Sequence, residues 1–237
     1  MDSDVARRLL RLNRDFYTAL ADPFARTRRR PQPGFGHLLE HLPQPCSSFL
    51  DVGCGEGRFG RFLLARYPHI DYHGIDFSEN LLEHARSSLP SGVFYQRDLS
   101  APRALSGLDS YTGMASLAVL QHIPGWSNRL RLIREMGSHL QEEGRLFLST
   151  WQFLDSERQR RKIVGWEEVG LKPAAVEEGD HLLTWRSGGF GLRYVAFIDL
   201  AAVKRLAREA GLRLIAHFRS DGREGNLNLY TMLGHAS

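Results

Sequence analysis

One glycine-rich segment constrains the fold more than any other part of the chain. An apolar run at residues 49–52 leads directly into three alternating glycines, Gly53, Gly55 and Gly57, and then into a helical pattern that starts near Arg58. Glycines suit such a turn because they accept a positive φ, and because a Cβ would block a ligand that lies against the backbone. A strand, a glycine turn and a helix in this order predict a nucleotide-binding crevice.

Strand and helix patterns alternate along most of the chain. Strands are expected at residues 48–52, 71–75, 92–95, 113–119 and 145–151, and helices at residues 58–66, 78–88 and 127–140. Strands that alternate with helices form βαβ units and therefore a parallel sheet. A helix at 199–210 and two strands at 212–218 and 226–233, joined by a turn-rich loop, end the pattern, so the last strand is expected to be antiparallel. The sequence predicts an α/β fold with a doubly wound, mostly parallel seven-stranded sheet.

Two segments have no place in this alternation. Residues 1–42 are expected to form a helical cap, with an amphipathic helix at 3–21 and a short second helix that ends near Leu42. Residues 153–197 read as an insertion that holds a charged helix at 155–164 and two short strands. The 237 residues are expected to form one domain, in which the cap and the insertion cover the crevice.

Charge and composition do not identify a partner, but they argue against a metal-binding cysteine cluster and a membrane span. The net charge is +4, and the first 30 residues carry eight Arg and four Asp, which accounts for the whole excess. This basic segment fits an anionic partner such as RNA and equally fits a solvated helix face. The two cysteines form no metal-ligand pattern, no apolar run approaches the ~18 residues of a membrane span, and a cytoplasmic location is expected.

Two ligands compete for the glycine turn. Residues 55–60 match G-x-G-x-x-G, and Asp76 follows about 20 residues later, as in dinucleotide-binding proteins, so an NAD-dependent oxidoreductase is one hypothesis. However, Asp51 and Glu56 would place two carboxylates where a pyrophosphate must lie, and like charges repel. A ligand with a cationic amino group and a sulfonium fits these acids better than a pyrophosphate does.

Three segments together indicate such a ligand. DVGCGEG occupies residues 51–57, Asp76 ends the next strand, and Asp98 follows the third. This order resembles the class I S-adenosylmethionine-dependent methyltransferases over about residues 45–150, which implies their Rossmann-like fold and cofactor. By this resemblance Asp76 would hold the ribose hydroxyls, and Asp98 with Leu99 would meet the adenine. The Asp51 region and Leu117 would face the methionine amino group, beside Gly53, Gly55 and Gly57. A non-catalytic adenosylmethionine-binding module is a further alternative.

Later segments resemble a narrower group. LAVLQHI at residues 117–123, STWQF at 149–153, GLRYVAF at 191–197 and GNLNLY at 225–230 resemble the eukaryotic tRNA wobble-uridine 5-carboxymethyl methyltransferases. The chain has Gln121 and Val195-Ala196 where that family carries a histidine and a Tyr-His pair. The resemblance implies a tRNA acceptor, with a small carboxylate, amine or hydroxyl as the alternative. It leaves open whether a small activator protein is required.

Three residues are candidates for the acceptor side. An acceptor carboxylate is already ionised at neutral pH and needs no general base, but it needs a cation to orient it. Arg193 offers a planar fork for a carboxylate, and Tyr194 could stack on a base. His122 would be the base for an amine or hydroxyl acceptor. The structural alternatives are a surface salt bridge for Arg193, a core ring for Tyr194 and a loop hydrogen bond for His122. No metal ligand is expected.

Overall fold

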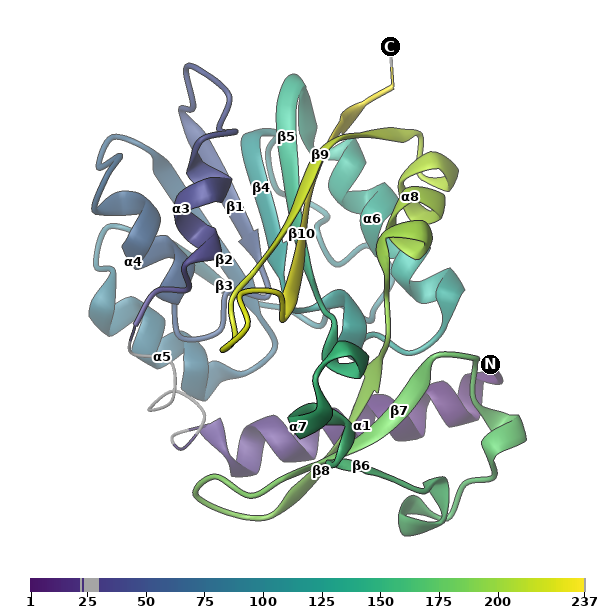
Figure 1. The fold of residues 1–237 in the computed structure, drawn as a ribbon. Coiled ribbons are helices and arrows are strands. Elements are labelled where there is room, and N and C mark those ends of the chain that lie inside the picture. The colour runs from purple at the N-terminus through teal and green to yellow at the C-terminus, as the bar shows by residue number, and fades with distance from the viewer. Residues whose placement is uncertain (22, 24–29, 237) are drawn as a thin grey trace.

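A seven-stranded sheet forms the centre of the protein (Figure 1). The computed structural model describes residues 1–21, 23 and 30–236. The strand order is β3-β2-β1-β4-β5-β10-β9. The strands are β1 (Ser48–Val52), β2 (Asp71–Asp76), β3 (Val93–Gln96), β4 (Tyr111–Leu117), β5 (Leu140–Trp151), β9 (Leu212–Ser220) and β10 (Asn228–His235). The strands β1 to β5 pair in parallel, whereas β10 is antiparallel to both of its neighbours, so the predicted fold class is confirmed.

Helices pack on both faces of this sheet because its strands alternate their apolar side chains. Leu50 and Val52 belong to the core that includes residues of α6 (Trp126–Ser138) and α8 (Leu200–Glu209). Phe49 points to the opposite core. There it packs with aromatic side chains of α3 (Gly34–Leu39) and α4 (Arg58–Leu64), and Leu89, which follows α5 (Glu79–Ser88), belongs to the same core. The apolar β1 is therefore buried on both sides, and its carboxyl end is fixed in position.

The insertion forms a small antiparallel sheet of its own, in the order β6-β7-β8. Its strands are β6 (Ile163–Val164), β7 (Asp180–Trp185) and β8 (Gly191–Ala196), and the last two confirm the two predicted short strands. The expected helix at 155–164 is wrong beyond its first turns. Only α7 (Glu157–Arg160) is helical, because the β-branched Ile163 and Val164 pair with β7 instead. Short 3-10 helices, η2 (Phe153–Asp155), η3 (Trp166–Val169) and η4 (Pro173–Ala175), complete the segment.

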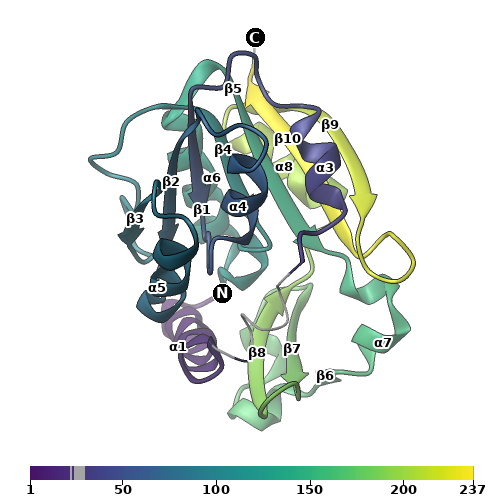
Figure 2. The ribbon, with the colours of Figure 1, turned by 90° about the vertical axis from the view of Figure 1, so that its left-hand side faces the viewer.

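The N-terminal helix α1 (Ser3–Ala19) lies beside this small sheet, and both sit at the end of the central sheet where the parallel strands terminate (Figures 1 and 2). Asp2 caps α1 by accepting a hydrogen bond from the Asp4 amide. Three arginines of the basic segment, Arg26, Arg28 and Arg29, lie outside the described residues. Within the described residues, no helix is long and apolar enough to cross a membrane.

Candidate functional site

A pocket opens at the carboxyl ends of β1, β2 and β4 and is closed on its other side by α1 and β8. It brings together nearly every candidate residue that the sequence supplied. Those that line it are Asp51, Gly53, Gly55, Asp76, Asp98, Leu99, Leu117, His122 and Arg193. Gly57 lies outside the lining; its φ of 77° favours glycine, and a Cβ there would also crowd Ala85 and Leu89 at 3.2 Å. Tyr194 is also outside the lining.

The glycine loop holds its shape through backbone hydrogen bonds and positive φ angles. The amides of Gly53 and Cys54 both donate to the Ile75 carbonyl, at 2.7 and 2.9 Å. Gly53 has a φ of 84°, and a Cβ there would lie 2.3 Å from a methyl group of Val119. Gly55 has a φ of 55°, and a Cβ there would meet nothing within 4 Å. The backbone at Gly55 therefore faces open space into which a ligand can come close.

The carboxylate of Asp76 is held by the loop and by the start of α5. Its oxygens accept hydrogen bonds from the amides of Gly55 and Ser78, both at 2.9 Å. Burial raises its pKa to about 6. The hydrogen bonds from these amides lower the pKa, because they favour the charged form, but burial has the larger effect. Each oxygen keeps a lone pair, so the group can accept hydrogen bonds from two vicinal hydroxyls in addition.

Asp98 is held differently, at the edge of α1. It accepts hydrogen bonds from the Ser100 amide at 2.9 Å and the Ser100 hydroxyl at 2.6 Å, and it forms an ion pair with Arg14. Partial burial would raise its pKa, but the hydrogen bonds of Ser100 and Arg14 outweigh burial, and the pKa is lowered. The ion pair ties α1 to the segment that follows β3.

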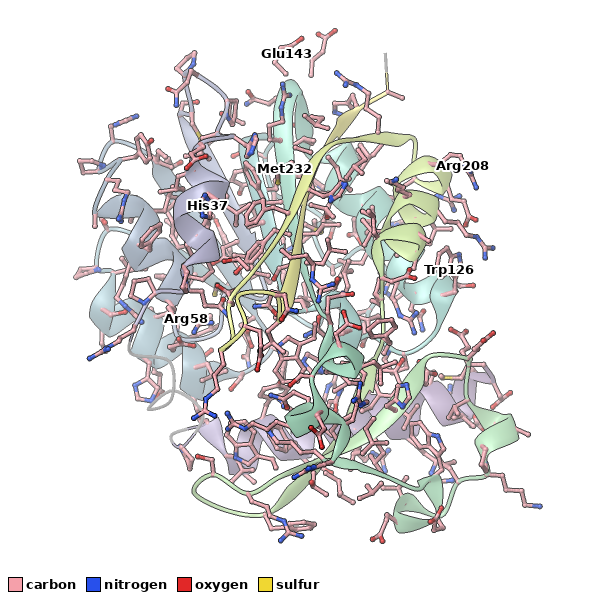
Figure 3. The ribbon with its side chains drawn as sticks, in the orientation of Figure 1. His37, Arg58, Trp126, Glu143, Arg208 and Met232 are labelled. Carbon is pink, nitrogen blue, oxygen red and sulfur yellow. The ribbon has the colours of Figure 1, made fainter. Side chains whose placement is uncertain are left out.

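Two more acids lie deeper in the pocket. Asp51 is buried and accepts a hydrogen bond from the Tyr72 hydroxyl at 2.8 Å. Burial, with smaller contributions from Asp76 and Glu56, raises the pKa of Asp51 to about 7. Glu56 is also buried, and its Oε1 has no hydrogen-bond partner among the described residues. Arg58, at the first turn of α4 on the side that faces α1, lines the same pocket (Figure 3).

This end of the pocket therefore offers carboxylates for a cationic amino group, with an arginine nearby for a carboxylate. An unpartnered buried acceptor such as Glu56 Oε1 is costly without a donor, which a bound ammonium group would provide. The open backbone at Gly55 and the free lone pairs of Asp76 complete a set of groups that fits the amino acid and ribose portions of adenosylmethionine.

Arg193 lies on the opposite wall of the pocket, and its side chain is fully buried. The residue is 1% exposed, and its Nε and Nη2 have no hydrogen-bond partner among the residues that the structure describes. The guanidinium lies over the rings of Trp151, Trp185 and Phe16, at 4.5, 5.2 and 5.5 Å from the ring centroids. Burial lowers the pKa of Arg193, and the electrostatic influence of the nearby Tyr17 hydroxyl acts in the opposite direction. The structural alternative of a surface salt bridge is therefore wrong, because the side chain is buried.

The expected acceptor role of the Tyr194 ring is also wrong. Adjacent residues of a strand point to opposite faces, so Tyr194 points away from the wall that Arg193 forms. Its buried hydroxyl hydrogen-bonds to Asp180 at 2.6 Å and to Arg129 at 2.9 Å. Asp180 and Arg129 also form a buried ion pair at 3.3 Å. The ring of Tyr194 thus belongs to a polar cluster in the core, as the structural alternative had it.

His122, in η1 (Leu120–His122), has a partner at each ring nitrogen. Nδ1 lies 3.1 Å from the Tyr194 carbonyl oxygen, and Nε2 lies 3.0 Å from the Tyr17 hydroxyl. A carbonyl only accepts, so Nδ1 carries the proton and Nε2 of the neutral ring accepts from Tyr17. Both nitrogens are engaged, which makes His122 a poor general base and a good support for Tyr17.

The sequence interpretation missed several side chains of this pocket. Asn13 and Tyr17 of α1, and Trp151 at the end of β5, contribute to its lining. The first two had a signal in the sequence: they lie four residues apart on the stripe of α1 that is otherwise apolar, as Leu9 and Phe16 are. A buried asparagine on such a stripe needs partners from another segment.

The comparisons with known proteins agree with this geometry. The Methyltransferase domain family matches residues 5–217, and the chain belongs to that family. The protein is an S-adenosylmethionine-dependent methyltransferase, and its cofactor is S-adenosylmethionine. This assignment decides against the NAD-dependent oxidoreductase that the G-x-G-x-x-G spacing allowed.

Two individual relatives share about a third of their residues with this chain over the matched regions. The tRNA (carboxymethyluridine(34)-5-O)-methyltransferase of Saccharomyces cerevisiae is 30% identical over 158 residues, which cover 66% of this chain and 54% of that protein. The trans-aconitate 2-methyltransferase of Methylobacterium nodulans is 34% identical over 115 residues, which cover 48% of this chain and 42% of that one. The chain therefore spans about half the length of either relative or less. Among solved structures, an S-adenosylmethionine-bound amino pentose methyltransferase of Micromonospora echinaspora shares the fold, with a TM-score of 0.62, 16% identity and coverage of 88% of this chain and 94% of that one.

Proposed function

We propose that this methyltransferase forms a methyl ester on an acceptor carboxylate that Arg193 holds. The single observation that carries the proposal is the buried Arg193, which lines the cofactor pocket and whose Nε and Nη2 have no partner among the described residues. A buried guanidinium with unmet donors is costly, and a carboxylate that accepts two parallel hydrogen bonds from it removes that cost.

The chemistry requires little beyond positioning. Adenosylmethionine supplies a methyl group bonded to a sulfonium. An acceptor carboxylate oxygen forms a bond to this methyl carbon as the carbon–sulfur bond breaks, which yields a methyl ester and adenosylhomocysteine. No proton is removed, so the engaged ring of His122 is no obstacle. Arg193 orients the acceptor, and the aromatic rings around it exclude water, so catalysis arises mainly from proximity.

The acceptor that we propose is a carboxymethyl group on the wobble uridine of tRNA. Two kinds of relative support a carboxylate: the carboxymethyluridine of the yeast enzyme and the trans-aconitate of the bacterial enzymes both carry one. The tRNA choice is supported by the longer match to the yeast enzyme and by the basic start of the chain. A small carboxylate is the alternative that the test must separate.

The test supplies the purified protein with methyl-labelled adenosylmethionine and one of three acceptors. These are an anticodon stem-loop RNA with 5-carboxymethyluridine, the same RNA with unmodified uridine, and trans-aconitate. We expect a methyl product on the first RNA only, and we expect mild base to release the label because esters hydrolyse readily. Labelling of trans-aconitate alone would replace tRNA by a small acceptor. A base-stable product, or none on either carboxylate, would contradict ester formation.

A further inference from the structure

Gln121, in the middle of η1, has a buried side chain with one polar atom held and one unmet. The residue is 0% exposed, and it lines the pocket. Its Oε1 accepts a hydrogen bond from the Trp151 amide at 3.3 Å. Its Nε2 has no hydrogen-bond partner among the described residues. A buried donor without a partner is costly, and a group that enters the pocket with an acceptor atom removes this cost.

The end of the sheet fixes which atom of the Gln121 carboxamide is held. The strand β4 pairs with β5 as far as Leu117 and Ser149, and η1 follows β4. The Trp151 amide lies two residues further along β5, beyond this pairing, and donates to the Gln121 side chain instead. An N–H only donates, so the carboxamide oxygen faces Trp151 and the NH₂ group is the end left over. Gln121 therefore presents a donor to a ligand, and not an acceptor.

Trp151 also connects Gln121 with Arg193. Its backbone amide holds the Gln121 side chain, and its ring lies under the Arg193 guanidinium, 4.5 Å from the ring centroid. Both side chains are buried, and both carry donors without partners among the described residues, namely Nε2 of Gln121 and Nε and Nη2 of Arg193. One is neutral and the other is cationic. The acceptor side of the pocket thus offers a place for a carboxylate and, across Trp151, a place for a neutral oxygen.

We propose that Gln121 selects the base that carries the carboxylate: its Nε2 donates to the O4 carbonyl oxygen of uracil while Arg193 holds the 5-carboxymethyl group. This inference rests on the proposed ester-forming function. The C4 carbonyl of 5-carboxymethyluridine adjoins the C5 that carries the carboxymethyl group, so both groups lie on one edge of the base. Cytosine has an amino group at C4, and two donors that face each other leave both unpaired. Gln121 therefore favours uracil over cytosine.

The test uses two stem-loop RNAs that differ only in the modified base, which is 5-carboxymethyluridine or 5-carboxymethylcytidine. In the full chain, Gln121→Glu keeps an oxygen for the Trp151 amide but replaces the donor by an acceptor. Gln121→Met removes the donor and keeps a side chain of similar length. The matched control is Gln141→Glu, at an exposed glutamine outside the pocket lining. The readouts are kcat/KM for each RNA and for trans-aconitate, and the dissociation constant of adenosylhomocysteine.

We expect the wild type and Gln141→Glu to prefer the uridine RNA about tenfold or more in kcat/KM. Gln121→Met should bring the two RNAs within about twofold of each other, because neither base then faces a donor. Gln121→Glu should reverse the preference, because a carboxylate accepts from the cytosine amino group and repels the uracil O4. Adenosylhomocysteine affinity should stay within about twofold of wild type in every variant. The ratio of the two RNAs is decisive, since a loss of stability alone lowers both values equally.

Three results would overturn the inference while leaving ester formation intact. They are equal kcat/KM of the wild type for both RNAs, a wild-type ratio retained by Gln121→Glu and Gln121→Met, and labelling of trans-aconitate alone, which has no base. A wild-type protein that esterifies neither RNA nor trans-aconitate would contradict the proposed function itself, and the inference with it. The wild-type measurement thus distinguishes the two failures.

Discussion

The two sides of the pocket are built in contrasting ways. On the cofactor side, Asp76 and Asp98 are held mainly by backbone amides of the loops at the strand ends, as Asp98 is by Ser100 two residues later, and Arg14 also pairs with Asp98. Asp76 receives the amide of Ser78, two residues later, and the amide of Gly55 in the glycine loop, 21 positions earlier. On the acceptor side, Asn13 bonds Tyr194 across 181 positions, and Tyr17 bonds His122 across 105.

This contrast matches the two tasks of a methyltransferase. A cofactor that is shared by a whole family can be held by a local backbone motif, which changes little when surface segments change. The acceptor side that we propose is formed mainly by α1 and the insertion, which are the segments outside the βαβ pattern. Segments of this kind can be exchanged without disturbing the sheet, so they are the natural place for specificity.

The largest effect that we expect is the loss of turnover when Arg193, on the acceptor side of the pocket, is replaced. Arg193→Ala should lower kcat/KM for the carboxylate acceptor about 100-fold, because the acceptor loses a bidentate charge-assisted partner worth about 3 kcal/mol. Adenosylhomocysteine affinity, measured by calorimetry, should change less than about twofold. Arg193→Lys should recover only part of the loss, since an ammonium lacks the planar fork.

The control for this variant is Arg186→Ala, which removes an exposed arginine from the loop that joins β7 and β8. Turnover should stay at the wild-type level. An equal fall in cofactor affinity and turnover for Arg193→Ala would contradict the division of the pocket into two sides. Full turnover would remove Arg193 from the acceptor site.

A smaller effect is expected on the cofactor side as the pH changes. Burial raises the pKa of Asp51 to about 7, so its carboxyl is largely protonated at pH 6 and largely ionised at pH 8. A cationic amino group binds the ionised form better, so adenosylhomocysteine affinity should be highest above pH 7 and should weaken as the pH falls. The expected loss from pH 8 to pH 6 is about three- to tenfold by calorimetry.

Asp51→Asn should flatten this pH dependence and leave the affinity near its low-pH value, because the amide can still accept from Tyr72 but carries no charge. Any slope that remains near pH 6 is assigned to Asp76, whose pKa is also raised, to about 6. Asp109→Asn, at an exposed aspartate outside the pocket lining, is the control and should keep the full slope. A pH-independent affinity in the wild type would show that Asp51 is not near the amino group.

The same contrast explains what the sequence could predict. The strand β1, the glycine turn and the cap at Ser78 could be predicted from the sequence, because each depends on residues only a few positions apart. The burial of Arg193 could not be predicted from the sequence, because the aromatic rings over it come from three segments that only the fold brings together. The short β6 was missed for a related reason, since its pairing with β7 overrides a charged, helix-like pattern.

The smallest expected effect on turnover concerns Tyr194, which adjoins Arg193 in the chain but faces the core. Tyr194→Phe removes the hydroxyl that bonds Asp180 and Arg129, and a lost buried hydrogen bond costs about 1 to 3 kcal/mol. In a chain of this length each kcal/mol corresponds to about 2 to 4 °C in Tm. We therefore expect a lower Tm by calorimetric scanning, with kcat/KM within about twofold of wild type. Asp180 and Arg129 still pair at 3.3 Å, so the fold should survive the change. A large loss of turnover at an unchanged Tm would instead return the Tyr194 hydroxyl to the acceptor side and break the separation between these two neighbouring residues.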